Sequence, residues 1–119
     1  MIPHLFFYLA LSFLLVHEMD AIRCKEWRIF PLTYFLNDKI GYLVFMTLHI
    51  PLFYMLFWGL KSDAYRNDLI TGLDYFSLIH FVLHIIFLKH KKNEFKDALS
   101  WTIITGAALF GLLDLISKR

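Results

Sequence analysis

The sequence has little of what a soluble enzyme or a disulfide-rich secreted domain uses. Its one cysteine, Cys24, excludes an internal disulfide. It has no glycine-rich phosphate loop, no Cys-x-x-Cys pair and no Ser-His-Asp order, so the common soluble-enzyme motifs are absent. The formal net charge is only +2 over 119 residues, and no basic surface is interleaved with exposed aromatic residues. This charge pattern argues against nucleic acid as a partner.

Polar sequence is scarce as well, because 59% of the residues are hydrophobic and 18% are aromatic. A soluble chain of this length would need more polar sequence to cover its apolar core. The apolar residues gather in four stretches, each near the roughly 20 residues that a helix needs to cross a bilayer. These predicted spans cover residues 2–20, 40–60, 68–88 and 98–116. Short links predict antiparallel neighbours, so we expect an all-α fold, an antiparallel four-helix transmembrane bundle. Residues 1–119 would form a single integral membrane domain with an interfacial loop at 23–39.

The flanking charges predict how the chain sits in the membrane. The first apolar stretch lacks the positively charged start and the small-x-small cleavage site of a secretion signal, so we expect a retained span. Most lysines and arginines lie in the first and third links. Basic loops favour the cytoplasmic side, which predicts that both termini lie outside the cytoplasm. Membrane lipids are the expected partners, with anionic headgroups facing the lysines.

Ionisable residues interrupt the apolar spans at one depth. The stretch FLLVHEMDAIRC, residues 13–24, begins like a membrane span and then carries three ionisable side chains. At about 1.5 Å per residue, His17 falls about 22 Å from the outer edge, His80 about 18 Å and His84 about 24 Å. Counted along the second span, His49 also falls near 18 Å. Three helices therefore place imidazoles in one layer of the membrane.

The helical faces agree with this layer. His17 and Asp20 lie within about 60° of each other on the first helix, and His80 and His84 are one turn apart on the third. An ionisable side chain in lipid costs about 2.5 to 3.5 kcal/mol even on the lenient insertion scale. We therefore expect these side chains to face inward and to meet.

A histidine pair at i, i+4 can present two nitrogens to one metal ion, and facing helices can complete the ligand set. A mixture of imidazole and carboxylate ligands suits zinc or iron. The predicted ligands of a divalent metal ion are His17, Asp20, His49, His80 and His84. In an enzyme acting on a lipid, Glu18 would be the general base and the ion would lower the pKa of bound water. The alternative is a hydrogen-bonded polar core that only fixes helix register.

A family resemblance points to the same region. The stretch HEMDAIRCKEWRIFPL, residues 17–32, resembles the signature of a small, uncharacterised bacterial family of four-span membrane proteins. More distantly it resembles the HXXEE group, described as integral membrane metal-binding proteins. That pattern places two acids after the histidine, whereas here His17 is followed by Asp20 and then Ala21, so Glu18 or Glu26 would have to supply the second acid. The resemblance implies a bacterial cytoplasmic membrane protein with metal-binding capacity.

The segment KEWRIFP has two interpretations. It could cover the mouth of the polar layer with Glu26 turned inward, but its aromatic and basic residues are more typical of an interfacial anchor. We therefore predict an anchor.

Three functions remain open at this point. The first is a metal-dependent membrane protein, including a lipid-directed enzyme. The second is a proton- or ion-conducting subunit, which in so small a chain would need a homo-oligomer or a larger membrane complex. The third is a non-catalytic accessory or scaffold protein whose polar layer only specifies packing.

Overall fold

The computed structural model describes residues 3–118, so Ile2, in the first predicted span, and Arg119 lie outside the described residues. Within residues 3–118 the chain forms four α-helices and two short 3-10 helices, without a strand. In chain order they are α1 (Leu5–Arg23), η1 (Glu26–Arg28), α2 (Asp38–Lys61), α3 (Arg66–Ile86), η2 (Phe87–Lys89) and α4 (Ala98–Ser117). All four α-helices are long and apolar enough to cross a membrane. The predicted all-α, four-helix membrane bundle is confirmed.

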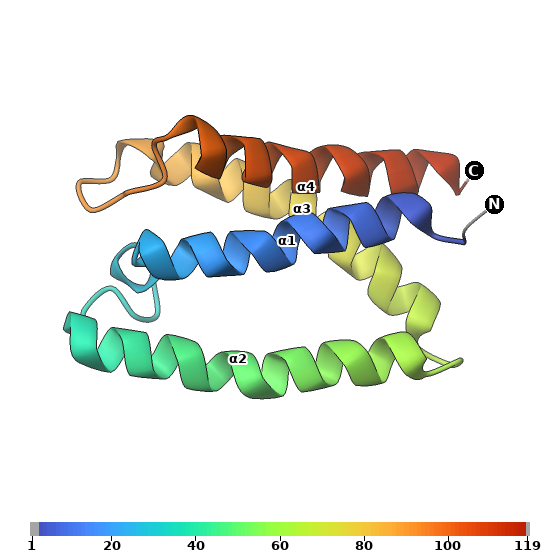
Figure 1. Ribbon diagram of the computed structural model, residues 1–119, viewed down its shortest axis with the longest axis horizontal. Helices are drawn as coiled ribbons and strands as arrows, with labels where there is room; N and C mark the ends of the chain where they lie inside the picture. Colours follow the sequence, from blue (N-terminus) through green and yellow to red (C-terminus); the bar gives the residue numbers. More distant parts are fainter. Residues whose placement is uncertain (1–2, 119) are drawn as a thin grey trace.

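The helices run up and down, so that both ends of the described chain lie at one end of the bundle (Figure 1). Side-chain caps set two of the starts. Asn37 accepts a hydrogen bond from the Ile40 amide at 2.9 Å, and Asp97 accepts one from the Ser100 amide at 3.1 Å. These caps satisfy amides that a helix start otherwise leaves unpaired.

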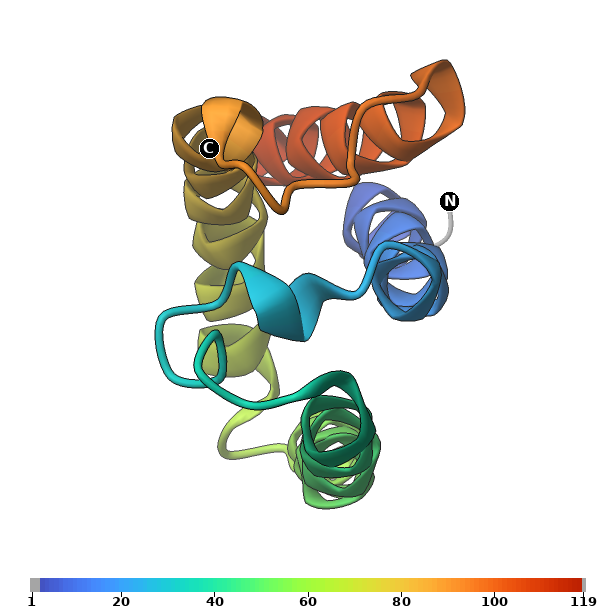
Figure 2. The same cartoon turned by 90° about the vertical axis from the view of Figure 1, so that its left-hand side faces the viewer.

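Packing is uneven between the helices. α4 lies along α1 and α3, whereas α2 stands apart from α1 and contacts η1 and α3 (Figures 1 and 2). Most of the buried hydrophobic side chains therefore come from α1, α4 and the segments at the end away from the termini. Two clusters of contacting side chains lie within this core: Phe7, Leu11 and Ile70, and separately Ala21, Cys24, Ile29, Phe95 and Ile104.

Buried acids near the termini are compensated by one lysine. The Lys118 ammonium lies 2.9 Å from a carboxylate oxygen of Asp74 and 2.9 Å from one of Asp114. Asp74 is on α3 and Asp114 is on α4, so this ion-paired group joins the two helices. Charged groups buried within a membrane protein are expected to pair in this way.

Close packing of α3 on α4 depends on Gly111. A Cβ atom at Gly111 would lie 2.2 Å from the Ser77 hydroxyl oxygen and 3.2 Å from the Asp74 backbone oxygen. Ser77 is fully buried and donates a hydrogen bond to that same oxygen at 2.7 Å, so it cannot turn away without losing the bond. Small residues let membrane helices approach closely, as they do here.

We predict that Gly111→Ala destabilises the protein by about 1 to 2 kcal/mol, because overpacking outweighs the better helix propensity of alanine. Gly72→Ala is the matched control, since nothing lies within 4 Å of a Cβ at that position on α3. The measurement is the denaturation midpoint of each purified variant in the same detergent. A Gly111→Ala protein as stable as Gly72→Ala would contradict this account of the α3–α4 contact.

Candidate metal centre

Three histidine nitrogens converge between α1 and α3. The Nε2 atom of His80 lies 3.0 Å from Nε2 of His17 and 3.1 Å from Nε2 of His84. His80 and His84 share one face of α3 because they are one helical turn apart. All three side chains are buried, and His17 is 0% exposed.

Hydrogen bonding alone does not satisfy this arrangement. The Nε2 of a neutral imidazole carries either one hydrogen or one lone pair, so it makes one hydrogen bond in the ring plane. Nε2 of His80 has two nitrogen neighbours, and Nε2 of His17 faces both His80 and, at 3.2 Å, a carboxylate oxygen of Glu26. For His80 Nε2 and for His17 Nε2 alike, at least one of the two close contacts therefore has no hydrogen between its atoms. A cation among the nitrogens would use all their lone pairs at once.

Glu26 completes the cluster from the loop after α1. One ligand atom from each of His17, Glu26, His80 and His84 can be chosen so that all four lie within 4.8 Å of one another. Lys25 adopts the left-handed conformation, with φ 52°, and this turn folds η1 back under the helix so that Glu26 reaches His17. Figure 2 shows η1 crossing the end of the bundle between the helices. The Glu26 side chain is 21% exposed.

Neighbouring contacts hold η1 in this place. The Trp27 indole donates a hydrogen bond to the Asp38 carboxylate at 3.1 Å, and Arg28 forms an ion pair with the same carboxylate. Thr33 donates a hydrogen bond to the Trp27 carbonyl at 2.9 Å. The residue after Glu26 is thus fixed to the start of α2, which restricts where the Glu26 carboxylate can lie.

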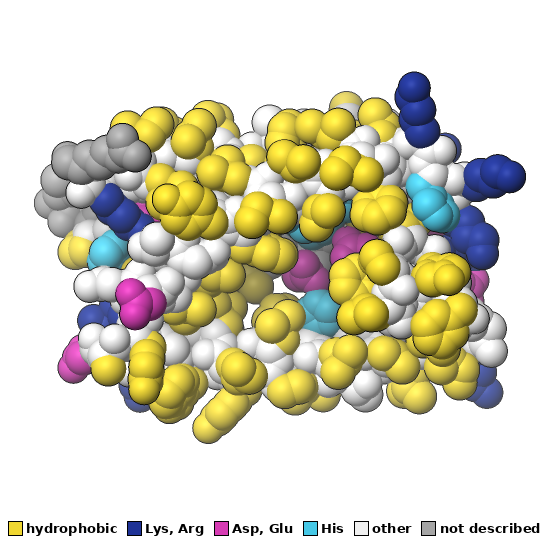
Figure 3. Space-filling view, turned by 180° about the vertical axis from the view of Figure 1, so that it is seen from behind, with side chains coloured by type: hydrophobic (Ala, Val, Ile, Leu, Met, Phe, Trp, Pro, Cys, Tyr) yellow, Lys and Arg dark blue, Asp and Glu magenta, His cyan; other side chains and the backbone are white. Residues whose placement is uncertain are grey.

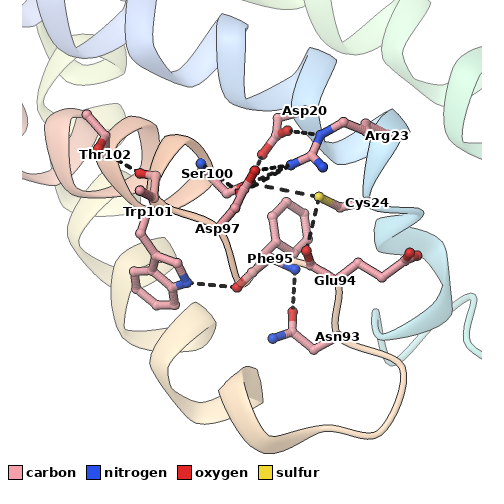
Figure 4. Close-up of polar contacts among 11 residues, drawn as sticks. Asp20, Arg23, Cys24, Asn93, Glu94, Phe95, Asp97, Ser100, Trp101 and Thr102 are labelled. Atoms are coloured by element: carbon pink, nitrogen blue, oxygen red, sulfur yellow. Dashed lines mark hydrogen bonds and ion pairs between the residues drawn. The ribbon is translucent and has the colours of Figure 1, made fainter.

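Aromatic rings orient the imidazoles. Phe95, fully buried in the loop between η2 and α4, stacks on His17 with ring centres 5.4 Å apart and meets His84 edge-on at 4.6 Å. The backbone of Phe95 is held on both sides (Figure 4): its amide donates to Asn93 at 3.1 Å, and its carbonyl accepts from Trp101 at 2.7 Å. Packing therefore fixes the ring orientations that bring the nitrogens together.

The Glu26 carboxyl of the cluster and the nearby Cys24 thiol differ in charge state. Burial alone would raise the pKa of the Glu26 carboxyl, but its hydrogen bond to His17 and the three nearby imidazoles lower that pKa below its ordinary value. Glu26 is therefore available as a carboxylate ligand. Burial, together with the Asp20 carboxylate, raises the pKa of the Cys24 thiol to about 11. Cys24 therefore stays a thiol, which is a poor metal ligand.

Comparison with known protein families matches residues 3–119 to the family of unknown function DUF6713. The chain belongs to the DUF6713 family. Comparison with curated proteins and with solved structures found no match. The matched range includes the whole His/Glu cluster of this DUF6713 protein.

The structure brings three of the five predicted ligands of this DUF6713 protein into the cluster: His17, His80 and His84. The other two, Asp20 and His49, have other partners. Asp20 accepts hydrogen bonds from Arg23, at 2.8 Å, and from the Ser100 hydroxyl. Figure 4 shows this network, in which Arg23 also reaches Asp97. It ties α1 to the start of α4.

His49 and Glu18 are bonded to each other. His49 Nε2 lies against Glu18 Oε2, and His49 Nδ1 lies 2.6 Å from the Phe45 carbonyl oxygen. Glu18, the predicted general base, therefore pairs with a predicted ligand on α2. Glu26 is the cluster residue absent from the predicted ligands. Two sequence signals point to it: the HXXEE-like pattern needs Glu18 or Glu26 as its second acid, and the KEWRIFP segment has the alternative interpretation in which Glu26 turns inward.

A cavity of about 130 Å³ reaches the cluster of this DUF6713 protein from the side. Glu26, His80 and His84 line it, and the rest of the wall is apolar. On the rear face, Figure 3 shows histidine and acidic side chains at the bottom of a hollow bordered by hydrophobic side chains. A small molecule or part of a lipid can therefore approach the nitrogens.

Proposed function

We propose that this DUF6713 protein binds one divalent transition metal ion inside the membrane, with His17, Glu26, His80 and His84 as ligands. The observation that carries the proposal is the convergence of three imidazole nitrogens and one carboxylate oxygen. In a tetrahedral zinc site with Zn–N bonds of about 2.0 to 2.1 Å, ligand nitrogens lie about 3.3 Å apart. The two nitrogen–nitrogen contacts of 3.0 and 3.1 Å and the nitrogen–oxygen contact of 3.2 Å come close to that spacing.

Zinc and ferrous iron are the metals that fit this ligand set best. Imidazole nitrogens with one carboxylate oxygen suit both ions, whereas magnesium and calcium prefer sites made of oxygen ligands alone. The buried thiol of Cys24 adds no competing soft ligand. We therefore keep zinc or iron as the proposed cofactor.

The position of Glu26 supports a role beyond structural support. Catalytic metal sites keep one exchangeable position, whereas structural sites are closed by protein ligands. Glu26 comes from a loop, is the most exposed of the four ligands, and borders the side cavity. Displacement of Glu26 would leave three histidines and open a position towards that cavity. This arrangement supports a metal-dependent enzyme whose substrate arrives from the lipid.

We also propose a bacterial cytoplasmic membrane location with both termini outside the cytoplasm. The termini lie at one end of the bundle (Figure 1). Basic residues gather at the other end, between the last residue of α1 and the start of α2 and again between η2 and α4. Basic segments favour the cytoplasmic side. The metal centre would then lie nearer the cytoplasm.

Elemental analysis of the purified protein tests the metal site. We expect about one zinc or iron ion per chain after purification in detergent without chelators. Chelation should lower the thermal midpoint, and Zn²⁺ but not Mg²⁺ should restore it, because an ion that binds only the folded state stabilises that state. Protein purified without metal that also shows no stabilisation by Zn²⁺, Fe²⁺ or Co²⁺ would overturn the proposal.

A further inference from the structure

A second hollow lies between α1 and α2, and none of the four proposed metal ligands lines it. It consists of two cavities, of about 450 and 220 Å³, which share Leu15, Glu18 and Phe53 in their walls. The two form one groove along the side of the bundle where α2 stands apart (Figure 1). Because all the flanking helices are membrane spans, this α1–α2 groove opens to lipid.

The walls of the α1–α2 groove are apolar except at one point. Among residues 3–118, Glu18 and His49 are the only polar side chains that line it, and they are bonded to each other. Their side chains remain 24% and 19% exposed. A polar pair facing hydrocarbon is costly in a membrane, so its exposure in this groove calls for an occupant that forms hydrogen bonds.

The hydrogen bonds of His49 define the charge of the pair. Its Nδ1 atom lies 2.6 Å from the Phe45 carbonyl, which can only accept, so Nδ1 carries a hydrogen. One further proton is then shared between His49 Nε2 and Glu18 Oε2. Whether that proton resides on nitrogen or on oxygen, the pair has no net charge. The pair therefore matches a neutral oxygen group better than a carboxylate or phosphate.

We infer that the α1–α2 groove binds a neutral lipid: a long apolar chain whose hydroxyl group donates a hydrogen bond to Glu18 of the Glu18–His49 pair. The chain would lie against the apolar walls. Within residues 3–118 the hydrogen bond of the Glu18 side chain is made by Oε2, to His49, which leaves Oε1 as an acceptor for the lipid hydroxyl.

The groove also borders the metal centre. Glu18 follows His17 directly in α1, and Phe76 lines both the groove and the side cavity that contains His80 and His84. A lipid held by the Glu18–His49 pair would therefore have its polar end close to the ion. In this respect the inference rests on the proposed metal function: the neutral lipid is the substrate class of that centre.

Photolabelling tests the lipid site. Protein in phosphatidylcholine nanodiscs is irradiated with a diazirine-bearing hexadecanol, and the labelled peptides are mapped by mass spectrometry. We expect labels in residues 15–22 and 45–57. Met46→Trp fills the groove and should lower this labelling about tenfold, since the indole displaces about two methylenes of the chain. Leu48→Trp, on the same helix but outside the groove wall, is the control and should label as the wild type does.

The double variant Glu18→Leu/His49→Phe separates the polar contact from the apolar groove, because it removes both members of the pair. In the wild type, we expect the alcohol to label about fivefold more than a diazirine-bearing hexadecane, which corresponds to one hydrogen bond. In Glu18→Leu/His49→Phe the two probes should label equally. Equal labelling of all four helices in the wild type and in Met46→Trp would overturn the inference. Native mass spectra give a second outcome that would overturn the inference. If Met46→Trp turned a dimer into a monomer, Leu48→Trp did not, and the groove stayed unlabelled, the occupant of the groove would be a second copy of the chain.

Cobalt spectroscopy distinguishes this inference from the metal proposal. In Co²⁺-loaded protein, hexadecanol should shift the visible absorption of the ion in the wild type and leave it unchanged in Met46→Trp. Absence of any Co²⁺ absorption would overturn the metal site, whatever the labelling shows. A normal Co²⁺ spectrum that hexadecanol does not alter, in protein whose groove is labelled, would overturn the substrate assignment alone.

Discussion

His80→Gln and His84→Gln proteins will retain less than about one-tenth of the metal that the wild type carries. Loss of a group that only supports a ligand already costs about 10- to 100-fold in metal affinity, so loss of a ligand should cost at least 100-fold. Glutamine keeps a polar side chain at each position, which limits damage to the fold. Elemental analysis of detergent-purified proteins, with circular dichroism to check helix content, provides the measurement.

Two matched histidine variants serve as controls. His49→Gln removes an imidazole that is partly buried but lies outside the cluster, and His90→Gln removes an exposed one. Both should carry as much metal as the wild type. If His49→Gln lost metal as completely as His84→Gln, the ligand set would have to include His49 and the proposed four-ligand centre would be wrong.

Glu26→Gln gives a graded result in the same experiment. Three imidazoles remain after this change, and three histidines suffice to hold zinc in some catalytic sites. We therefore expect Glu26→Gln protein to purify with bound metal. A chelator too weak to remove the metal from the wild type should remove it from this variant. Complete retention against that chelator would exclude Glu26 from the ligand set.

Hydropathy and helical periodicity were enough to predict the four helices and part of the site. The long apolar stretches admit few other folds, since a lipid environment requires each span to satisfy its own backbone hydrogen bonds. The i, i+4 spacing of His80 and His84 places both on one face of α3, and depth counting puts His17 at their level. These residues do meet in the structure.

Two other predicted ligands could not be placed by the same reasoning. Asp20 lies near the His17 face, but Arg23 and Ser100 offer it closer partners. His49 has the expected depth, yet α2 stands apart from the rest of the bundle, so His49 bonds to Glu18 instead. Depth and helical face do not reveal how far a helix stands from its neighbours.

The position of the Glu26 carboxylate depends on the backbone conformation of Lys25, which lies between α1 and η1. The segment KEWRIFP has the composition of an interfacial anchor, and η1 does pack Trp27 against the start of α2. The left-handed turn at Lys25 is what directs Glu26 back towards His17. Lysine rarely adopts this conformation, so the local sequence does not predict the turn.

Gly41→Ala will weaken metal binding about tenfold without changing any ligand. A Cβ at Gly41 would lie 2.4 Å from Cδ1 and 2.8 Å from Cγ of Trp27, a buried and rigid ring. Trp27 follows Glu26, so displacing the ring moves η1 and the carboxylate away from the imidazoles. Overpacking typically costs about 1 to 3 kcal/mol. If about 1.4 kcal/mol of this cost is relieved when the metal is released, the dissociation constant of the metal rises tenfold. Competition with a chromogenic chelator measures the affinity.

A double substitution shows whether Gly41 acts through Glu26. Gly72→Ala, which meets no neighbouring atom, should leave metal affinity unchanged. In a Glu26→Gln background, Gly41→Ala should add little further loss, because the carboxylate that it displaces is already gone. Non-additivity of this kind is what coupled positions show, whereas independent sites add. If Gly41→Ala instead weakened binding equally in both backgrounds, the contact between α2 and η1 would affect the histidines directly, and Trp27 would not be the residue that positions the fourth ligand.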